Sequence, residues 1–304
     1  MIQRNHIRFT MIVIMYLVTS LPLWASAEEV GNFTEILHKV DYQKGETSPP
    51  MPAEVKAPVE VKNIVNTFEL SRAQILFRDK STITIAPQSR VTIEDYMFDP
   101  SRFERNATLD LIRGVIKVVT TPESKGTFNI KTTTAVMGVR GTEFIAVTGS
   151  NFTVVYSLKN VVCIKAVNLK TGKYIVRPVA PGEKEEAEEV CLPPGTMSVI
   201  LPNQMPSTPQ PVSAAIMALA QGLVQSGITQ IPGVCVVGTL PGVDLVSVAD
   251  DLMSRGANLA NVKASLTDVC FDATTYSYSA PAPPLSPSAA TTNFPGGKGG
   301  FASP

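Results

Sequence analysis

The feature that most constrains this chain is a long succession of short segments in which apolar and polar residues alternate. Thr82–Ile85 and Arg90–Ile93 alternate with period two on either side of the turn-like sequence Ala-Pro-Gln-Ser at 86–89. Such alternation is typical of β-strands that bury one face. Roughly ten such segments, at spacings of about ten residues, predict a mainly β fold of the sandwich, barrel or β-roll type. The predicted strands are 73–77, 82–85, 90–93, 109–112, 115–120, 128–132, 143–148, 151–157, 160–168, 173–177 and 196–201.

The regions on either side of these strands have different patterns. Residues 33–40 are expected to form a short helix, and the prolines that follow, between 49 and 58, remove amide donors and indicate a linker or an extended edge. Beyond the proline-rich stretch 205–211, apolar residues recur at helical spacing. Three short helices are therefore predicted, at 216–223, 245–252 and 259–269, with Gly256 and Asn258 as caps between the last two.

These patterns divide the chain into consecutive parts. The last part is rich in Pro, Ser, Ala, Thr and Gly, has few apolar residues, and is expected to be flexible. The expected divisions are a signal peptide at 1–27, a linker at 28–66, a β domain at 67–204, a small helical segment at 205–279 and a tail at 280–304.

The first residues have the three parts of a secretory signal peptide. A basic start at 4–8 precedes an apolar run at 9–18, and small residues stand at 25–27, so cleavage is expected just before Glu28. The alternative is an uncleaved anchor, but Pro22 interrupts the run before it reaches the roughly 20 residues that span a bilayer. No other segment of the sequence is long and apolar enough to span a bilayer, and the mature protein is expected to be periplasmic or secreted.

Composition argues against several kinds of chemistry. Both histidines lie within the first 38 residues, so the rest of the chain has no imidazole to serve as a base or a metal ligand. Lys plus Arg and Asp plus Glu number 26 each, which disfavours a nucleic-acid binder. We therefore expect no catalytic residues, no cofactor and no metal.

Four cysteines remain after the expected cleavage, and an even number in an exported chain favours disulfides. Four cysteines allow three connectivities, of which the pairing of sequence neighbours is the simplest: Cys163 with Cys191 and Cys235 with Cys270. A metal site is the less favoured alternative, since none of the spacings is Cys-x-x-Cys and no histidine is near.

Two stretches of the β region carry distinctive motifs. Residues 76–89 are Leu-Phe-Arg-Asp-Lys-Ser-Thr-Ile-Thr-Ile-Ala-Pro-Gln-Ser, and residues 130–144 end in Gly-Val-Arg-Gly-Thr-Glu-Phe. Both resemble the FecR-like domain of exported bacterial proteins: the first is similar to a family pattern with Asp-Gly-Ser and Gly-Pro-Asn-Ser, and the second to the family's most specific motif. The resemblance covers about 68–167, with Lys80 where the family has Gly and Thr133 where it has Pro. It implies an extracytoplasmic β domain. Family members that regulate sigma factors have a cytoplasmic segment before a membrane helix, and no such segment is expected here.

The motif at 138–144 comprises Gly138, Val139, Arg140, Gly141, Thr142, Glu143 and Phe144. Two glycines around an arginine suggest a tight bend between strands, with the guanidinium held inside the domain by a carboxylate or by carbonyls. The alternative is that Arg140 and Glu143 form a ligand-binding edge. We expect the structural role, because a bend with a buried ion pair explains the whole heptad.

Acidic residues provide the remaining candidates. The run at 183–189 is expected to be a solvated loop, because like charges repel and it lacks a calcium-loop pattern. Asp79, Glu94, Asp95 and Asp99 could supply paired carboxylates for glycoside hydrolysis.

We therefore expect an exported, non-enzymatic FecR-like protein that serves as a binding, signalling or presentation module in the bacterial envelope. Its partner is expected to be an envelope or extracellular protein or glycan. The alternatives are a carboxylate-based hydrolase of envelope polysaccharide and a signal-relay subunit whose helical part docks on a membrane sensor.

Overall fold

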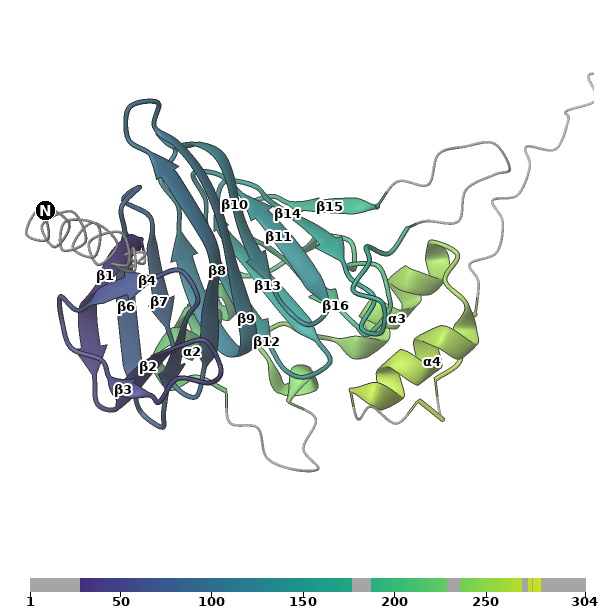
Figure 1. Ribbon diagram of the computed structural model, residues 1–304. Coiled ribbons are helices and arrows are strands. Elements are labelled where there is room, and N and C mark those ends of the chain that lie inside the picture. Colours follow the sequence, from purple (N-terminus) through teal and green to yellow (C-terminus); the bar gives the residue numbers. More distant parts are fainter. Residues whose placement is uncertain (1–27, 177–186, 229–235, 270–272, 275, 280–304) are drawn as a thin grey trace, which may run out of the picture.

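The computed structural model describes residues 28–176, 187–228, 236–269, 273–274 and 276–279, and these form a β structure with helices packed at one side (Figure 1). The strands are β1 (Glu29–Leu37), β2 (Val40–Lys44), β3 (Met51–Pro52), β4 (Pro58–Glu60), β5 (Asn63–Thr67), β6 (Arg72–Phe77), β7 (Thr82–Ile85), β8 (Arg90–Asp99), β9 (Glu104–Val119), β10 (Lys125–Lys131), β11 (Ala135–Val139), β12 (Glu143–Thr148), β13 (Thr153–Lys159), β14 (Val162–Ala166), β15 (Glu189–Leu192), β16 (Thr196–Ile200) and β17 (Gln210–Pro211). The helices are α2 (Ala214–Ser226), the 3₁₀ turn η1 (Val237–Thr239), α3 (Leu245–Ser254) and α4 (Leu259–Asp268).

The strands form two sheets that share the long strand β9. One sheet, here called the helix-covered sheet, has the order β4-β1-β6-β7-β9-β12-β13-β16-β17. The other, the solvent-facing sheet, has the order β3-β2-β5-β8-β9-β10-β11-β14-β15. The pairing is antiparallel except between β9 and β10. The sheet is not closed, so of the predicted β architectures a closed barrel is excluded and the mainly β fold is confirmed.

Strand β9 passes from one sheet to the other through a bend at Gly114. Before the bend, alternate residues from Arg105 to Leu111 face the interior, and after it Ile116 and Val118 do, so the inward-facing parity changes. Gly114 has φ +101°, and a Cβ atom there would lie 2.1 Å from the Ser89 Oγ atom. The sequence predicted two strands with a break at this glycine, whereas the structure has one strand with a bulge.

The main core fills the space between the two sheets. Ile83, Val118 and Phe144 of the helix-covered sheet pack in one cluster with Leu109 and Phe128 of the solvent-facing sheet. Strands with only one buried face keep the alternation seen in the sequence, as in β7 and β14. The alternation of apolar and polar residues in the sequence therefore reflects the burial of one face of each such strand in this core.

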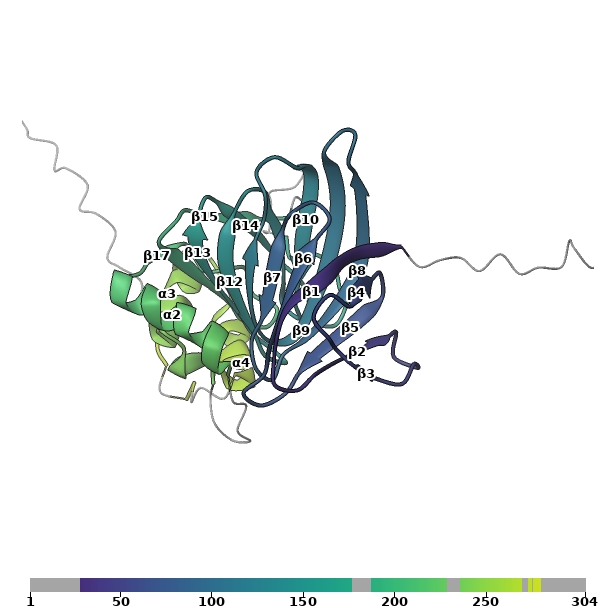
Figure 2. The same cartoon turned by 90° about the vertical axis from the view of Figure 1, so that its left-hand side faces the viewer.

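A second core lies between the other face of the helix-covered sheet and the helices. Strands β12 and β13 are buried along almost their whole length, which is why their sequences are nearly continuous apolar runs. Ile145, Val154 and Tyr156 of these strands pack with Val248 of α3 and Leu266 of α4. In both views α3 and α4 lie on the opposite side of the molecule from β2 and β3 (Figure 2).

The helix predicted at 33–40 is wrong. This stretch belongs to β1 and β2, and β1 pairs with β6 from Gly31↔Phe77 to Leu37↔Arg72. Phe33 is fully buried in the main core, so pairing with a strand forty residues away outweighs local helical spacing. The predicted linker at 28–66 likewise contributes strands β1–β5 to both sheets.

The three helices predicted after the β region are present. Helix α4 begins at its expected cap, where the Asn258 side chain accepts hydrogen bonds from the amides of Ala260 and Asn261. Gly256, expected as a cap of α3, follows the capping residue Arg255 with φ +87°. Within the described residues, no helix is both long and apolar enough to cross a membrane.

Candidate functional site

The family-like motif at 138–144 forms the bend between β11 and β12, as the sequence predicted. Gly141 has φ +62°, and a Cβ atom there would lie 2.8 Å from the Cβ atom of Pro122. The Asn160 amide donates a hydrogen bond of 2.5 Å to the Gly141 carbonyl. Glycine is required at this point both for its conformation and for the close approach of the neighbouring loop.

Two other motif residues hold the bend to the rest of the domain. The backbone N–H of Thr142 donates to the Thr120 hydroxyl at 2.9 Å, and the Thr120 N–H donates to the Thr142 carbonyl, also at 2.9 Å. Phe144 is fully buried in the main core. Gly141, Thr142 and Phe144 therefore explain part of the motif by folding alone.

Beside this bend lies a pocket of about 310 Å³, here called the motif pocket. Its lining combines two motif side chains with three segments distant in sequence: Lys80, Val119, Thr120, Thr121, Pro122, Gly141, Thr142, Glu143, Lys159 and Asn160. Glu143 is ion-paired with Lys117 at 2.7 Å, and Lys80 lies 3.6 Å from Glu123. Lys159 is exposed and forms no ion pair with any described residue, so the rim of the motif pocket carries a net positive charge.

The buried role predicted for Arg140 is wrong. Arg140 is exposed and forms no ion pair within the described part of the chain. The backbone of the bend is instead satisfied by Asn160 and Thr120, so the guanidinium is not needed inside the domain. Arg140 therefore stands on the surface next to the residues that line the motif pocket.

The buried arginine of this domain is Arg105, which the sequence analysis did not single out. Its side chain is fully buried and forms an ion pair with Asp79, also fully buried. The Arg105 Nη1 atom also donates to the Ser81 hydroxyl at 2.7 Å, and that hydroxyl donates to Asp79 at 2.7 Å. Burial and the neighbouring Asp79 carboxylate raise the pKa of Tyr96, whose hydroxyl donates to Asp79 at 3.2 Å. Four polar side chains thus form one network inside the main core.

This network fixes the turn that carries Lys80. Asp79 and Ser81 are held from inside, and the Thr121 amide donates to the Ser81 hydroxyl at 3.3 Å. Lys80 itself has φ +69°, a conformation that glycine adopts without strain. The Arg105 guanidinium also lies over the Phe128 ring, 4.9 Å from its centroid. Buried charges therefore position a lysine at the rim of the motif pocket.

Comparison with known families gives the same assignment as the motifs. Residues 63–163 match the family described as FecR protein. The chain contains a FecR domain. The match agrees with the resemblance expected from 68–167, and it includes the whole motif and the Asp79–Arg105 pair.

Two crystal structures of provisionally designated anti-sigma factors from Parabacteroides distasonis ATCC 8503 are similar to the chain. Their identities are 11% and 10% and their TM-scores 0.36 and 0.35. The alignments cover 51% of this chain in each case, and 62% and 64% of those chains. The similarity thus spans less than two thirds of either protein. No curated protein matches the chain.

None of the carboxylates considered for hydrolysis lines the motif pocket. Asp79 is buried against Arg105, Glu94 is ion-paired with Lys62 at 2.7 Å, and Asp95 is exposed. Hydrogen bonds from Ser101 lower the pKa of Asp99. The motif pocket contains one carboxylate, Glu143.

One carboxylate outside that group has a perturbed pKa. Burial raises the pKa of Asp110, and the nearby charge of Glu94 raises it further. Asp110 lies on β9, opposite Thr92 of β8 and Lys131 of β10, and it does not line the motif pocket. Asp110 is therefore a carboxylate on a face of the solvent-facing sheet.

The predicted disulfide between Cys163 and Cys191 is present and joins directly opposed residues of β14 and β15. The ligand atoms of Glu189 and of these two cysteines lie within 4.8 Å of one another, but the sulfur atoms are bonded together and are not free thiolates. Cys235, Cys270 and residues 183–186 of the acidic run lie outside the described residues.

Proposed function

We propose that this protein is an exported, non-enzymatic FecR domain module that binds an acidic segment of an envelope protein at the motif pocket. The observation that carries the proposal is the division of the motif into two sets. Gly141, Thr142 and Phe144 hold the fold, whereas Glu143 lines the pocket and Arg140, next to Gly141 in the chain, is exposed. Exposed cations that the fold does not use are available to a partner.

The charges around the pocket support an acidic partner. Lys80 and Lys159 line the pocket, Arg140 lies beside it, and its one carboxylate is neutralised by Lys117. Complementary charge at the rim of an interface increases association rates and selects among partners. Binding should therefore weaken as salt concentration rises.

Hydrolysis of envelope polysaccharide is the less favoured function. Glycoside hydrolysis uses two carboxyl groups on either side of the bond that is cleaved. The motif pocket offers one, and that one is ion-paired. The site is better suited to binding.

An extracytoplasmic location is part of the proposal. The signal-peptide pattern at 1–27 and the Cys163–Cys191 disulfide support it, because disulfides persist in oxidising compartments. N-terminal sequencing of the protein from a periplasmic or secreted fraction should begin at Glu28. A chain that retains Met1 in the membrane fraction would contradict cleavage.

Charge reversal tests the binding site. The mature chain and its Arg140→Glu/Lys159→Glu variant would each be immobilised and exposed to an envelope extract. Arg102→Glu serves as the control, because Arg102 is exposed and does not line the pocket. We expect an acidic protein that is retained by the wild type and by the control but lost with the double variant. Equal retention by all three folded proteins would contradict the proposed site.

A further inference from the structure

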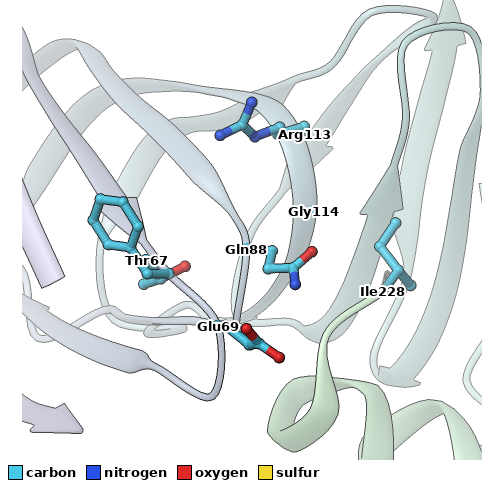
Figure 3. A pocket seen from close by; sticks show the side chains of 7 residues that line it. Thr67, Glu69, Gln88, Arg113, Gly114 and Ile228 are labelled. Carbon is cyan, nitrogen blue, oxygen red and sulfur yellow. The ribbon is translucent and has the colours of Figure 1, made fainter. Parts of the chain in front are cut away.

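A second pocket lies where the FecR domain meets the segment after α2, and the proposed function does not use it. This junction pocket has a volume of about 290 Å³ (Figure 3). It is lined by the end of β5, the turn between β7 and β8, the bend of β9 and the residue that follows Gly227: Thr67, Phe68, Glu69, Gln88, Arg113, Gly114 and Ile228. Pockets between structural units are common ligand sites.

Two opposite charges face this pocket without pairing. Arg113 and Glu69 are both exposed, and neither forms an ion pair with a described residue. They lie on opposite sides of the cavity, with Gln88 between them (Figure 3). The Gln88 side chain forms no hydrogen bond with the described part of the chain either, although its backbone amide donates to the Phe68 carbonyl at 3.1 Å.

Two other arginines of the β region do pair. Arg90 contacts Glu46 at 2.7 Å, and Arg78 contacts Glu28 at 3.0 Å. Arg113 lies opposite Arg90 on the neighbouring strand, but it forms no ion pair with a described residue and lines the junction pocket. The charges of Arg113 and Glu69 are therefore available to a ligand of the junction pocket.

The walls of the pocket are firmly held. The Ser89 hydroxyl accepts from the Val115 amide at 3.0 Å, and the Ser89 amide donates to the Thr67 hydroxyl at 2.9 Å. Gly114, with φ +101°, packs directly against Ser89. A rigid wall reduces the entropy cost of binding, because the site loses little conformational freedom when a ligand binds.

The pocket also has an apolar part. Phe68 is 38% exposed, and Ile228 approaches from the C-terminal segment. A volume of about 290 Å³ is at the small end of the range for ligand pockets, so a metabolite of few atoms fits better than an oligomer. A ligand complementary to these walls has one anionic group, one cationic group and a short apolar part.

We propose that the junction pocket binds a free amino acid. Arg113 pairs with the carboxylate, Glu69 pairs with the ammonium group, and the side chain lies toward Phe68 and Ile228. A planar guanidinium can hold a carboxylate through two parallel hydrogen bonds. Because Ile228 follows α2, the ligand would bridge the FecR domain and the C-terminal segment.

The test measures binding of the standard amino acids to the mature chain by ligand-observed NMR and by thermal melting, each at about 10 mM so that millimolar affinities are detected. We expect at least one amino acid to bind and to raise the melting temperature. Its carboxamide and its N-acetyl derivative, which each lack one charge, should bind at least about tenfold more weakly.

Variants separate this site from unspecific binding. Arg113→Gln and Glu69→Gln should each weaken binding by about tenfold or more, whereas Arg102→Gln, at an exposed arginine away from the pocket, should not change it. If no amino acid binds the folded chain, or if both pocket variants bind as tightly as the wild type, the proposal is wrong. Neither result affects the motif pocket, which is lined by different residues.

Discussion

Asp79 and Arg105 form a buried ion pair inside the FecR domain. Both side chains are fully buried, so removal of one leaves the other charge without a partner in the core. We predict that Arg105→Ala lowers the free energy of unfolding by about 3–5 kcal/mol. Urea unfolding of the mature chain, followed by circular dichroism, measures this difference.

Arg105→Lys and Arg140→Ala serve as controls for that prediction. Only the Nη1 atom of Arg105 forms hydrogen bonds to described residues, while Nε and Nη2 have none, so one ammonium can replace part of the contact. Arg105→Lys should therefore lose less stability than Arg105→Ala. Arg140→Ala, at an exposed site, should stay within about 0.5 kcal/mol of the wild type. A larger effect at Arg140 than at Arg105 would reverse our assignment of the buried arginine.

Lys80 is strained at a position where the FecR family has glycine. Its φ is +69°, and an L-residue in this region is disfavoured by about 1 kcal/mol or more. Lys80→Gly removes the strain together with an exposed contact of 3.6 Å to Glu123 and a cation–π contact with Phe103, so we predict a gain of up to about 0.5 kcal/mol in unfolding free energy. Lys125→Gly, in strand β10 and without a positive φ, should instead be destabilising in the same melts.

Strand β9 depends on the absence of a side chain at its bend. A Cβ atom on Gly114 would lie 2.6 Å from the Ser89 Cα atom, and the φ of +101° is unsuited to alanine. We predict that Gly114→Ala costs about 2–4 kcal/mol or prevents folding. The motif glycine Gly138 is a matched control, since its nearest atom would be 3.7 Å away, and Gly138→Ala should change stability by less than about 1 kcal/mol. A loss of less than about 1 kcal/mol in Gly114→Ala would show that the bend tolerates a side chain.

The disulfide joins β14 to the edge strand β15. It closes a loop with a sequence separation of 28 residues, and cross-links of this size stabilise by about 3–4 kcal/mol. Cys163→Ser/Cys191→Ser should therefore lower the melting temperature of the mature chain. Peptide mapping of the oxidised protein tests the predicted Cys235–Cys270 pair separately, and crossed pairs or four free thiols would contradict the predicted connectivity.

Sequence patterns predicted the elements whose environment is local. Alternation identified most strands from β6 onward, and Asn258 marked the start of α4, because burial of one face and capping are recorded within a few residues. The strands β1–β5 were missed, since their partners lie far along the chain. Arg105 had a usable signal, its alternation with the buried Ala107 and Leu109, but its partner Asp79 is 26 residues away. Which arginine was buried could not be read from the motif alone.

At the scale of the whole molecule, the helical segment and the β domain share a core. The helix-covered sheet presents Ile145, Val147 and Val154 to the helices, and all three are fully buried. The Tyr156 hydroxyl donates at 2.7 Å to the carbonyl of Pro241, which precedes α3. The segment at 205–279, predicted as a separate part, therefore covers an apolar sheet face that the FecR domain cannot cover itself.

This shared core predicts the result of truncation. A chain of residues 28–212 keeps both sheets but loses α2, α3 and α4, and it exposes the buried side chains of β12, β13 and β16. Each such side chain contributes about 1.5–3 kcal/mol by its burial, so loss of several equals the whole stability of a typical domain, about 5–15 kcal/mol. We expect 28–212 to bind a hydrophobic dye and to aggregate, whereas 28–279 should melt like the mature chain. A monomeric 28–212 with a cooperative melt would show that the FecR domain folds independently of the helices.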